Sequence, residues 1–203
     1  MILASQSPRR RELLQLCGCT FRVASADVDE EAIAREMLAG HKAGEDFLAL
    51  VTVVVGRLAE AKAAAAAESL GNAAESVILS SDTVVVLGEK VLGKPRDEAE
   101  ARYMLRRLAG QEHRVLTGVC IRADGRSEVF ASEAAVRFYP ADAFMEHLID
   151  HYVETGSPLD KAGAYGIQDE GALLVEAIHG DFYTVMGLPV AETARRLQKY
   201  LYA

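Results

Sequence analysis

A polar turn followed by three arginines lies close to the start of the chain, in the segment SQSPRRR. Ser7 can cap a helix that begins at Pro8, and Arg9, Arg10 and Arg11 follow in its first turn. The free N–H groups and the dipole of a helix N-terminus attract anions, and guanidinium groups match phosphate oxygens. The pattern therefore indicates a phosphate site, although a capped surface helix with solvated arginines explains the same spacing equally well.

One carboxylate, Asp82, follows the apolar run 77–79 and two serines. A carboxylate fixed near the end of a buried strand could accept a proton or bind a metal ion, whereas a strand-terminating turn residue explains its position equally well. Mg²⁺ prefers one or two carboxylates together with substrate phosphates. Glu30 lies in the acidic segment 27–31, so Glu30 and Asp82 are the candidate ligands of a divalent cation, Mg²⁺ or Mn²⁺.

Three lysines lie in short motifs, AEAKA, LGKPR and LDKAG, and these are Lys62, Lys94 and Lys161. Lysines that converge on one site would neutralise a triphosphate. Taken singly, each lysine is more typical of a solvated surface. The hypothesis of a polyphosphate site therefore requires that these three lysines lie close together in the fold.

Other familiar sites are missing or weak. The chain lacks GxxxxGK[ST], GxGxxG and GxSxG, which removes the P-loop, dinucleotide-binding and nucleophile-elbow readings. His147 and His151 have a spacing that can bind zinc, but Leu148 stands where the HExxH motif has glutamate, and a polar helix face is favoured. Cys17, Cys19 and Cys120 form no CxxC pair, which predicts reduced thiols in a cytoplasmic protein that serve as small apolar residues.

The composition bounds the class of protein. A chain of 203 residues that is 50% hydrophobic and 26% charged can bury one substantial core, so we expect a single domain over residues 1–203. The net charge of −8 should repel nucleic acid. No apolar stretch is long enough to cross a bilayer, which predicts a soluble protein with no membrane partner and no export.

Hydrophobic periodicity gives the elements that must position these residues. Helical spacing is expected over 9–17, 46–67, 97–108 and 141–153, with Phe144, Leu148 and Ile149 turned inward in the last of these, and again in a terminal helix after Pro189. Short strands are expected at 2–4, 20–24, 77–79 and 173–178, a hairpin near Gly88 and a second one around Asp124-Gly125. Helices alternate with strands early and antiparallel signals come later, so the fold class is α/β with a mixed, twisted sheet.

Five segments, in this order and spacing, resemble the Maf family of nucleotide pyrophosphatases. They are SQSPRRRELL, VDE at 28–30, SSDTVV, GKPRDEAEARYMLRRLAGQEHRVLTGV and GSPLDKAGAYGIQDEG. The resemblance implies an elongated α/β fold similar to the inosine triphosphate pyrophosphatases, with flanking helices and two lobes around a cleft. It also implies a homodimer.

The resemblance further implies that a nucleoside triphosphate is hydrolysed between its α and β phosphorus atoms with a divalent cation. By the same likeness Asp82 is the proton acceptor, and Ser5, Arg9, Arg10, Lys62, Lys94 and Lys161 hold phosphates. A free aspartate side chain has a pKa of about 3.9 and is a weak base unless a metal acidifies its water. Both roles of Asp82, base and metal ligand, therefore stay open.

Three positions are similar to the branch of the family that prefers dTTP and UTP: Arg9, Thr83 and Gln168. Gln168 could pair with the edge of a pyrimidine. Modified pyrimidine nucleotides stay possible substrates, because a pocket discriminates weakly against one added methyl group. The alternative function is a nucleotide-binding regulator of septum formation in cell division that has no significant turnover.

Overall fold

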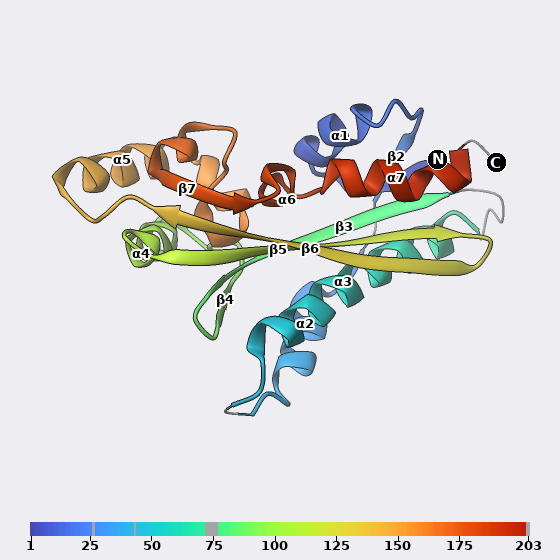
Figure 1. The fold of residues 1–203 in the computed structure, drawn as a ribbon, viewed down its shortest axis with the longest axis horizontal. Coiled ribbons are helices and arrows are strands. Elements are labelled where there is room, and N and C mark those ends of the chain that lie inside the picture. The colour runs from blue at the N-terminus through green and yellow to red at the C-terminus, as the bar shows by residue number, and fades with distance from the viewer. Residues whose placement is uncertain (26, 43, 72–76, 202–203) are drawn as a thin grey trace. The chain divides into compact units, whose positions relative to one another are not determined.

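The computed structural model describes residues 1–25, 27–42, 44–71 and 77–201, and its order of helices and strands is shown in Figure 1. Seven strands form one mixed sheet in the order β2-β1-β3-β5-β6-β7, with β4 paired to β3. The predicted α/β class with a mixed sheet and flanking helices is therefore confirmed. The bounds are β1 (Ile2–Ala4), α1 (Pro8–Gln15), β2 (Arg22–Ala24), α2 (Glu30–Leu38), α3 (Phe47–Ser69), β3 (Ile78–Leu87), β4 (Lys90–Leu92), α4 (Glu98–Leu108), β5 (Glu112–Ala123), β6 (Arg126–Phe138), α5 (Ala143–Glu154), β7 (Val175–Gly180), α6 (Phe182–Met186) and α7 (Val190–Leu201).

The chain forms two compact units. The first unit comprises residues 1–82, 117–132 and 187–203, and the second comprises residues 83–116 and 133–186. Strands β3, β5 and β6 pass from one unit to the other. Each unit is described separately below.

Three parallel strands build the first unit. β1 pairs with β2 in the register Ile2↔Arg22 and with β3 in the register Ile2↔Ile78. The chain leaves β1 through α1 to reach β2 on one side, and then passes through α2 and α3 to reach β3 on the other side. In open α/β sheets, ligands bind at the carboxyl ends of strands where the connections diverge in this way. Topology alone thus marks the carboxyl ends of β1 and β3.

Small residues bring α3 close to the sheet. Its alanines, among them Ala59, Ala63 and Ala66, form a fully buried cluster with Ile2 of β1 and Ile78 of β3. Gly118 of β5 lies so near the α3 backbone that a Cβ atom there would overlap the carbonyl of Val55. Alanine favours helix formation. In α3 the small alanine side chains also determine how closely the polar side chains of the helix approach β3.

Two hairpins form where the sequence predicts them. The turn between β3 and β4 has Gly88 in the left-handed region, and β3 pairs with β4 antiparallel through Leu87↔Lys90. Asp124 and Gly125, at φ 50° and 72°, join β5 to β6. Two consecutive positive φ values are typical of the tight turn that Asp-Gly favours.

The second unit has its own core, in which α4 and α5 cover the sheet. Met104, Leu105, Ile149 and Tyr152 belong to one buried cluster with strand residues. The predicted inward position of Phe144 is wrong, because its side chain is 69% exposed and Met145, the next residue, is buried instead. Asp142 caps α5 by accepting from the backbone N–H of Met145. The helix therefore starts at Ala143, two residues later than expected. Its packing against the core decides that Met145 rather than Phe144 lies on the buried face.

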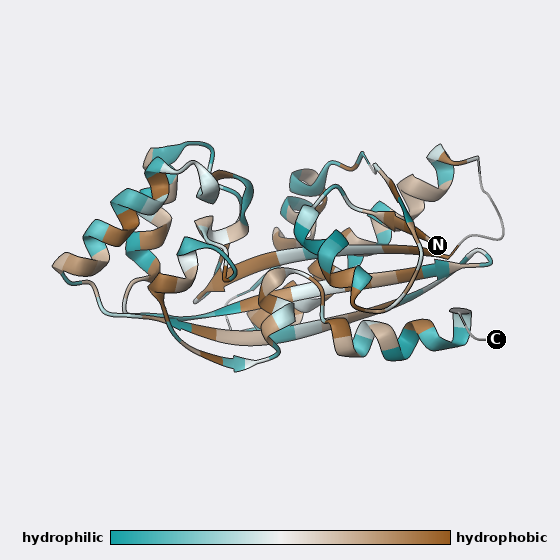
Figure 2. Ribbon diagram, turned by 90° about the horizontal axis from the view of Figure 1, so that it is seen from above, coloured by the Kyte–Doolittle hydropathy of each residue, from teal (hydrophilic) through white to brown (hydrophobic). Residues whose placement is uncertain are grey.

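Strand β3 is longer than its apolar run predicts. It continues from Ile78 to Leu87, so Asp82 lies inside the strand rather than near its end. The reading of Asp82 as a strand-terminating turn residue is thereby excluded. Figure 2 shows helices that carry both hydrophilic and hydrophobic residues, as expected of helices with one face on a sheet. Among the described residues, no helix combines the length and apolarity that spanning a membrane requires.

Candidate functional site

A lysine joins two carboxylates in the first unit. The ammonium nitrogen of Lys62 lies 2.5 Å from Oδ1 of Asp82 and 3.0 Å from Oε1 of Glu30. The side chains of Lys62 and Asp82 are only 10% and 8% exposed, whereas that of Glu30 is 46% exposed. Burial of this kind is tolerated because the opposite charges are paired. Three of the residues singled out from the sequence thus form one charged cluster, half open to solvent on the Glu30 side.

Strand alternation and helix spacing bring Lys62 to Asp82. Ser80 and Asp82 are two residues apart in β3 and therefore point to the same face of the sheet. The Ser80 hydroxyl donates to the carbonyl of Ala59 in α3, at 2.5 Å, which fixes this turn of the helix against the strand. Lys62 is three residues further along α3, on the same side, and so reaches Asp82. Ser80 and Ala59 were not singled out from the sequence, although a buried serine beside a charged residue is a usable signal.

The start of α1 contributes a second cation to this region. Ser7 caps the helix as predicted, since its Oγ accepts from the backbone N–H of Arg10 at 3.4 Å. The Nε of Arg10 donates to the carbonyl oxygen of Gly187 at 3.0 Å, and an Nη1 contact reaches Oγ of Ser5 at 3.4 Å. These contacts hold the guanidinium group beside Ser5, in the turn between β1 and α1.

Electrostatics connect Arg10 to the carboxylates. Burial lowers the pKa of Arg10 from its usual value, and the negative charges of Asp82 and Glu30 oppose that shift, while neighbouring Arg9 adds to it. A guanidinium group keeps its proton in proteins, so the consequence is a fixed positive charge near two carboxylates. Of the predicted cations, the structure thus places Lys62 in contact with Asp82 and the charge of Arg10 near it.

The carbonyl of Gly187 is a part of the site that sequence reasoning missed. It accepts from Arg10 and also from the hydroxyl of Ser81 at 2.9 Å. Ser81 follows Ser80 in β3 and so points to the opposite face of the sheet. The loop before α7 thereby anchors both α1 and β3. No local pattern reveals this link, because 177 residues separate Arg10 from Gly187.

The two carboxylates fit a hard divalent cation. Oxygens of Glu30 and Asp82 both lie within 3.0 Å of one nitrogen atom, so a single small cation in place of the ammonium group could contact both. Within the described ranges, no cluster of three or more His, Cys, Asp or Glu side chains could hold a metal. Two carboxylates are the number that Mg²⁺ uses when phosphates and water complete its shell, whereas structural zinc needs four ligands.

Lys161 is held in the second unit by a network of acceptors. Its ammonium nitrogen lies 2.6 Å from the carbonyl oxygen of Ser157, 2.8 Å from Oδ1 of Asp160 and 3.3 Å from Oδ2 of Asp169. Asp169 also accepts from the hydroxyl groups of Tyr152 and Ser157, at 2.9 Å each. Residues 156–171 thus contain short 3₁₀ turns that Asp169, which the sequence did not single out, ties together.

We expect Asp169 to be a structural centre of this loop. Asp169→Asn removes the negative charge that faces Lys161 and one hydrogen-bond acceptor. The change should lower the free energy of unfolding by about 2 kcal/mol. The loss is smaller than for a fully buried ion pair because Asp169 is partly exposed. Urea denaturation measures this. Glu170→Gln is the matched control, since Glu170 is exposed and its carboxylate lies 3.6 Å from the ring of exposed His151. Equal effects of the two changes would contradict the assignment.

The remaining candidate residues of the second unit differ in exposure. The side chains of Lys94 and Gln168 are exposed, and Thr83 is half-buried. Thr83 follows Asp82 directly in β3, so its side chain points to the opposite face of the strand. Gln168 immediately precedes Asp169, and Gly163, whose N–H donates to the carbonyl of Gly93 at 3.0 Å, ties the 156–171 loop to the segment that carries Lys94.

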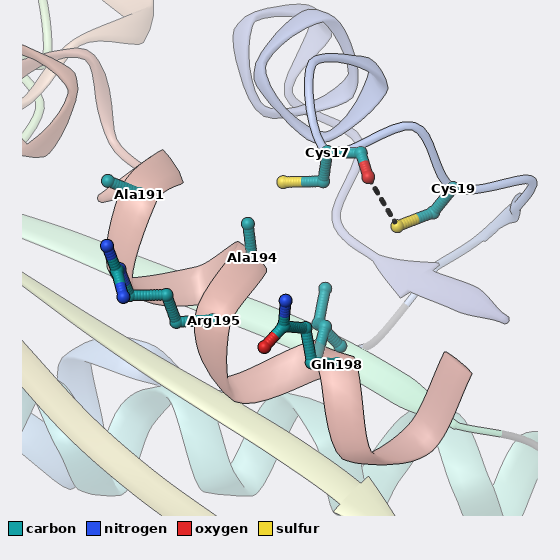
Figure 3. Close-up of a pocket in the computed structure, with 7 residues that line it drawn as sticks. Cys17, Cys19, Ala191, Ala194, Arg195 and Gln198 are labelled. Carbon is teal, nitrogen blue, oxygen red and sulfur yellow. Dashed lines mark hydrogen bonds between the residues drawn. The ribbon is translucent and has the colours of Figure 1, made fainter. Parts of the chain in front are cut away.

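A separate surface cavity of about 460 Å³ in the first unit is lined by Cys17, Cys19 and residues of α7 (Figure 3). The Cys19 thiol donates to the carbonyl of Cys17 at 3.5 Å. Burial raises the pKa of Cys17 to about 11, and it raises the pKa of Cys19 as well. Both groups are therefore thiols at neutral pH, and both are half-buried rather than core residues. Cys120 is buried in the core of the same unit.

Comparison with known proteins shows the family of this chain. The model of the Maf family, described as Maf-like protein, matches residues 1–200. A dTTP/UTP pyrophosphatase of Symbiobacterium thermophilum is 44% identical over 202 residues, covering 100% of this chain and 94% of that protein. Proteins of the same name from Bacillus velezensis and Bacillus pumilus are 43% and 42% identical over 200 residues, covering 98% of this chain and 96% of each relative. The chain therefore belongs to the Maf family.

Proposed function

We propose that this protein is a nucleoside triphosphate pyrophosphatase that hydrolyses dTTP and UTP to the monophosphate and pyrophosphate. The observation that carries the proposal is the cluster in which Lys62 joins Asp82 and Glu30 beside the arginine-rich start of α1. The names of relatives at 42–44% identity over almost the whole chain support the same reaction. The proposal treats residues 1–203 as one functional domain, as the family match over residues 1–200 suggests.

In this proposal, Glu30 and Asp82 hold a divalent cation, Mg²⁺ or Mn²⁺. A cation bound there supplies positive charge beside the phosphates and makes water more acidic. Water adds to one phosphorus atom while the oxygen bridge between the α and β phosphorus atoms breaks, and its proton passes to Asp82. Pyrophosphate leaves with the negative charge that forms when the bond breaks. The reaction needs no covalent intermediate on the protein.

Cationic side chains bind and orient the polyphosphate. Arg9, Arg10 and Lys62 in the first unit, with the Ser5 hydroxyl, match groups that hold phosphate oxygens. Lys94 and Lys161 of the second unit are assigned to the same task by resemblance. Because charge on the phosphates grows as the bond breaks, fixed cations stabilise the transition state more than the bound substrate.

Selection of the base is assigned to Arg9, Thr83 and Gln168. The exposed amide of Gln168 has both a donor and an acceptor, as a pyrimidine edge requires. Gln168 directly precedes Asp169, whose carboxylate accepts hydrogen bonds from Tyr152 and Ser157. These hydrogen bonds hold the neighbouring backbone in place. Modified pyrimidine nucleotides belong to the same proposal, because an added methyl group changes binding only modestly.

A nucleotide panel tests the function. With Mg²⁺ present, we expect pyrophosphate and the nucleoside monophosphate from UTP and dTTP, at kcat/KM values at least about tenfold above those for GTP and ATP. Chromatography of the products separates this reaction from phosphate release. A preference for 7-methyl-GTP would overturn the substrate assignment, and tight nucleotide binding without turnover would favour the regulatory alternative in cell division.

The proposal also includes a homodimer in the cytoplasm that acts on small nucleotides and has no nucleic acid or membrane partner. A net charge of −8 supports the exclusion of nucleic acid, since an acidic surface repels polyanions. Light scattering coupled to size exclusion measures the assembly. A monomer at micromolar concentration would contradict this part alone.

A further inference from the structure

Lys62 lies where a cation between Glu30 and Asp82 would lie. Its ammonium group contacts both carboxylates, at 3.0 Å and 2.5 Å, and is nearly enclosed. We propose that Lys62 is an exchangeable internal cation: it neutralises these carboxylates when no metal is bound, and a divalent ion displaces it toward the phosphates of the substrate. The inference rests on the proposed function in assigning Glu30 and Asp82 as the metal ligands.

Charge balance makes the two states exclusive. A buried carboxylate needs a counter-ion, and Asp82 finds it in Lys62. A divalent ion that contacts the same oxygens would be repelled by an ammonium group only a few ångströms away, because like charges interact strongly where water is excluded. The charge of Arg10 already stands near this pair. The two carboxylates therefore cannot contact the divalent ion and the Lys62 ammonium group at the same time.

The geometry of Lys62 suits a movement of the ammonium group. Its ammonium group contacts the two carboxylates. The four-carbon stem of lysine allows the charged end to move while the backbone of α3 stays fixed. Lys161 differs, because four acceptor atoms on three neighbouring residues of its own loop surround it. Lys62 and Lys161 are thus held differently, and of these two only the Lys62 ammonium group lies between candidate metal ligands.

A consequence is that Lys62 weakens metal binding in the absence of nucleotide. A polyphosphate that attracts the ammonium group away from the carboxylates would free the ligands for the ion. Binding of nucleotide and metal would then favour each other through one side chain. Loss of Lys62 should tighten metal binding while it weakens nucleotide binding, two changes of opposite sign.

Mn²⁺ titration without nucleotide tests this inference. Free Mn²⁺ is followed by electron paramagnetic resonance in native protein, Lys62→Met and Lys62→Gln. We expect both variants to bind one Mn²⁺ with a dissociation constant at least about tenfold lower than the native one. Arg57→Met is the matched control, because Arg57 is an exposed cation of the same helix that pairs with Glu60 instead. It should leave the affinity unchanged.

Two further variants make the result specific. Asp82→Asn introduced beside Lys62→Met should abolish the tight binding if these carboxylates are the ligands. Lys62→Gln keeps a donor for Asp82 and so replaces Lys62→Met in the comparison if the methionine variant does not fold without metal. Affinity for Mn²⁺ that is equal to or weaker than the native value in the folded lysine variants would overturn the inference.

Failure of the inference can be told apart from failure of the proposed function. Native protein that releases pyrophosphate from UTP, together with lysine variants that bind Mn²⁺ no more tightly, would remove the exchange and leave the enzyme. Tighter Mn²⁺ binding in the variants of a protein that hydrolyses no nucleotide would keep the exchange of cations and remove the reaction.

Discussion

Asparagine in place of Asp82 should lower kcat/KM for UTP by about a thousandfold or more, since the change removes both a metal ligand and the proton acceptor. The amide is almost the same size and still has one oxygen for Lys62, so the core of the first unit should keep its packing. What is lost is the negative charge that faces Lys62 at 2.5 Å and Arg10 at longer range. Pyrophosphate release at saturating Mg²⁺ measures the effect.

Asp27→Asn is the matched control for this change. Asp27 lies in the acidic segment before α2 and is exposed, so its loss alters the net charge equally. We expect its kcat/KM to stay within about threefold of native, because an exposed charge has little effect at a distance in salt. Similar activity of Asp82→Asn and native protein, both folded by circular dichroism, would remove Asp82 from catalysis.

Acid should destabilise the second unit through His113. The ring is 1% exposed, Nε2 lies 2.8 Å from the hydroxyl oxygen of Tyr165, and Phe138 packs edge-on against it. Burial lowers the pKa of His113 from 6.5 to about 3. The folded protein therefore keeps the ring neutral, while the unfolded chain binds a proton below pH 6.5. Stability from this residue is complete above pH 6.5 and is lost as the pH falls toward 3.

The expected size is about 1.4 kcal/mol per pH unit below 6.5, so roughly 3 kcal/mol by about pH 4. Urea denaturation across this range measures it. Because carboxylates titrate in the same window, the comparison is with His113→Gln, which is neutral at every pH and should show a shallower dependence. His147→Gln, at an exposed histidine of α5, should follow the native curve. Parallel curves for native protein and His113→Gln would contradict the role of His113.

Local patterns in the sequence determined most of the elements. The cap at Ser7, the turn at Asp124-Gly125 and the helices expected near 46–67 and 97–108 all form as predicted. Each depends on neighbours within a few residues, where side-chain type and backbone geometry are directly linked. The serine, arginine and lysine residues that a phosphate site needs were likewise recognisable from short motifs. Alternation of strands and helices was enough to predict the mixed α/β sheet.

Positions that depend on distant neighbours were harder to predict. The serines and aspartate after the run 77–79 suggested a strand end, yet β3 continues to Leu87, with β5 as its neighbour in the sheet and β4 paired to its last residues. Phe144 has the hydrophobicity of a core residue but lies outward, since the packing of α5 buries Met145 and Ile149 instead. Hydrophobicity gives a tendency to be buried, and only the neighbouring elements decide which face is covered.

The residues alone showed a carboxylate, Asp82, after an apolar run, several separate cations and the family pattern that groups them. The packing of distant segments places Lys62 against Asp82, brings the charge of Arg10 near that pair, anchors Arg10 on the carbonyl of Gly187 and holds Lys161 in its own loop. The physical reason is range. Caps and turns form between groups a few residues apart, whereas a charged cluster forms where a helix, a strand and a loop far apart in the chain pack together.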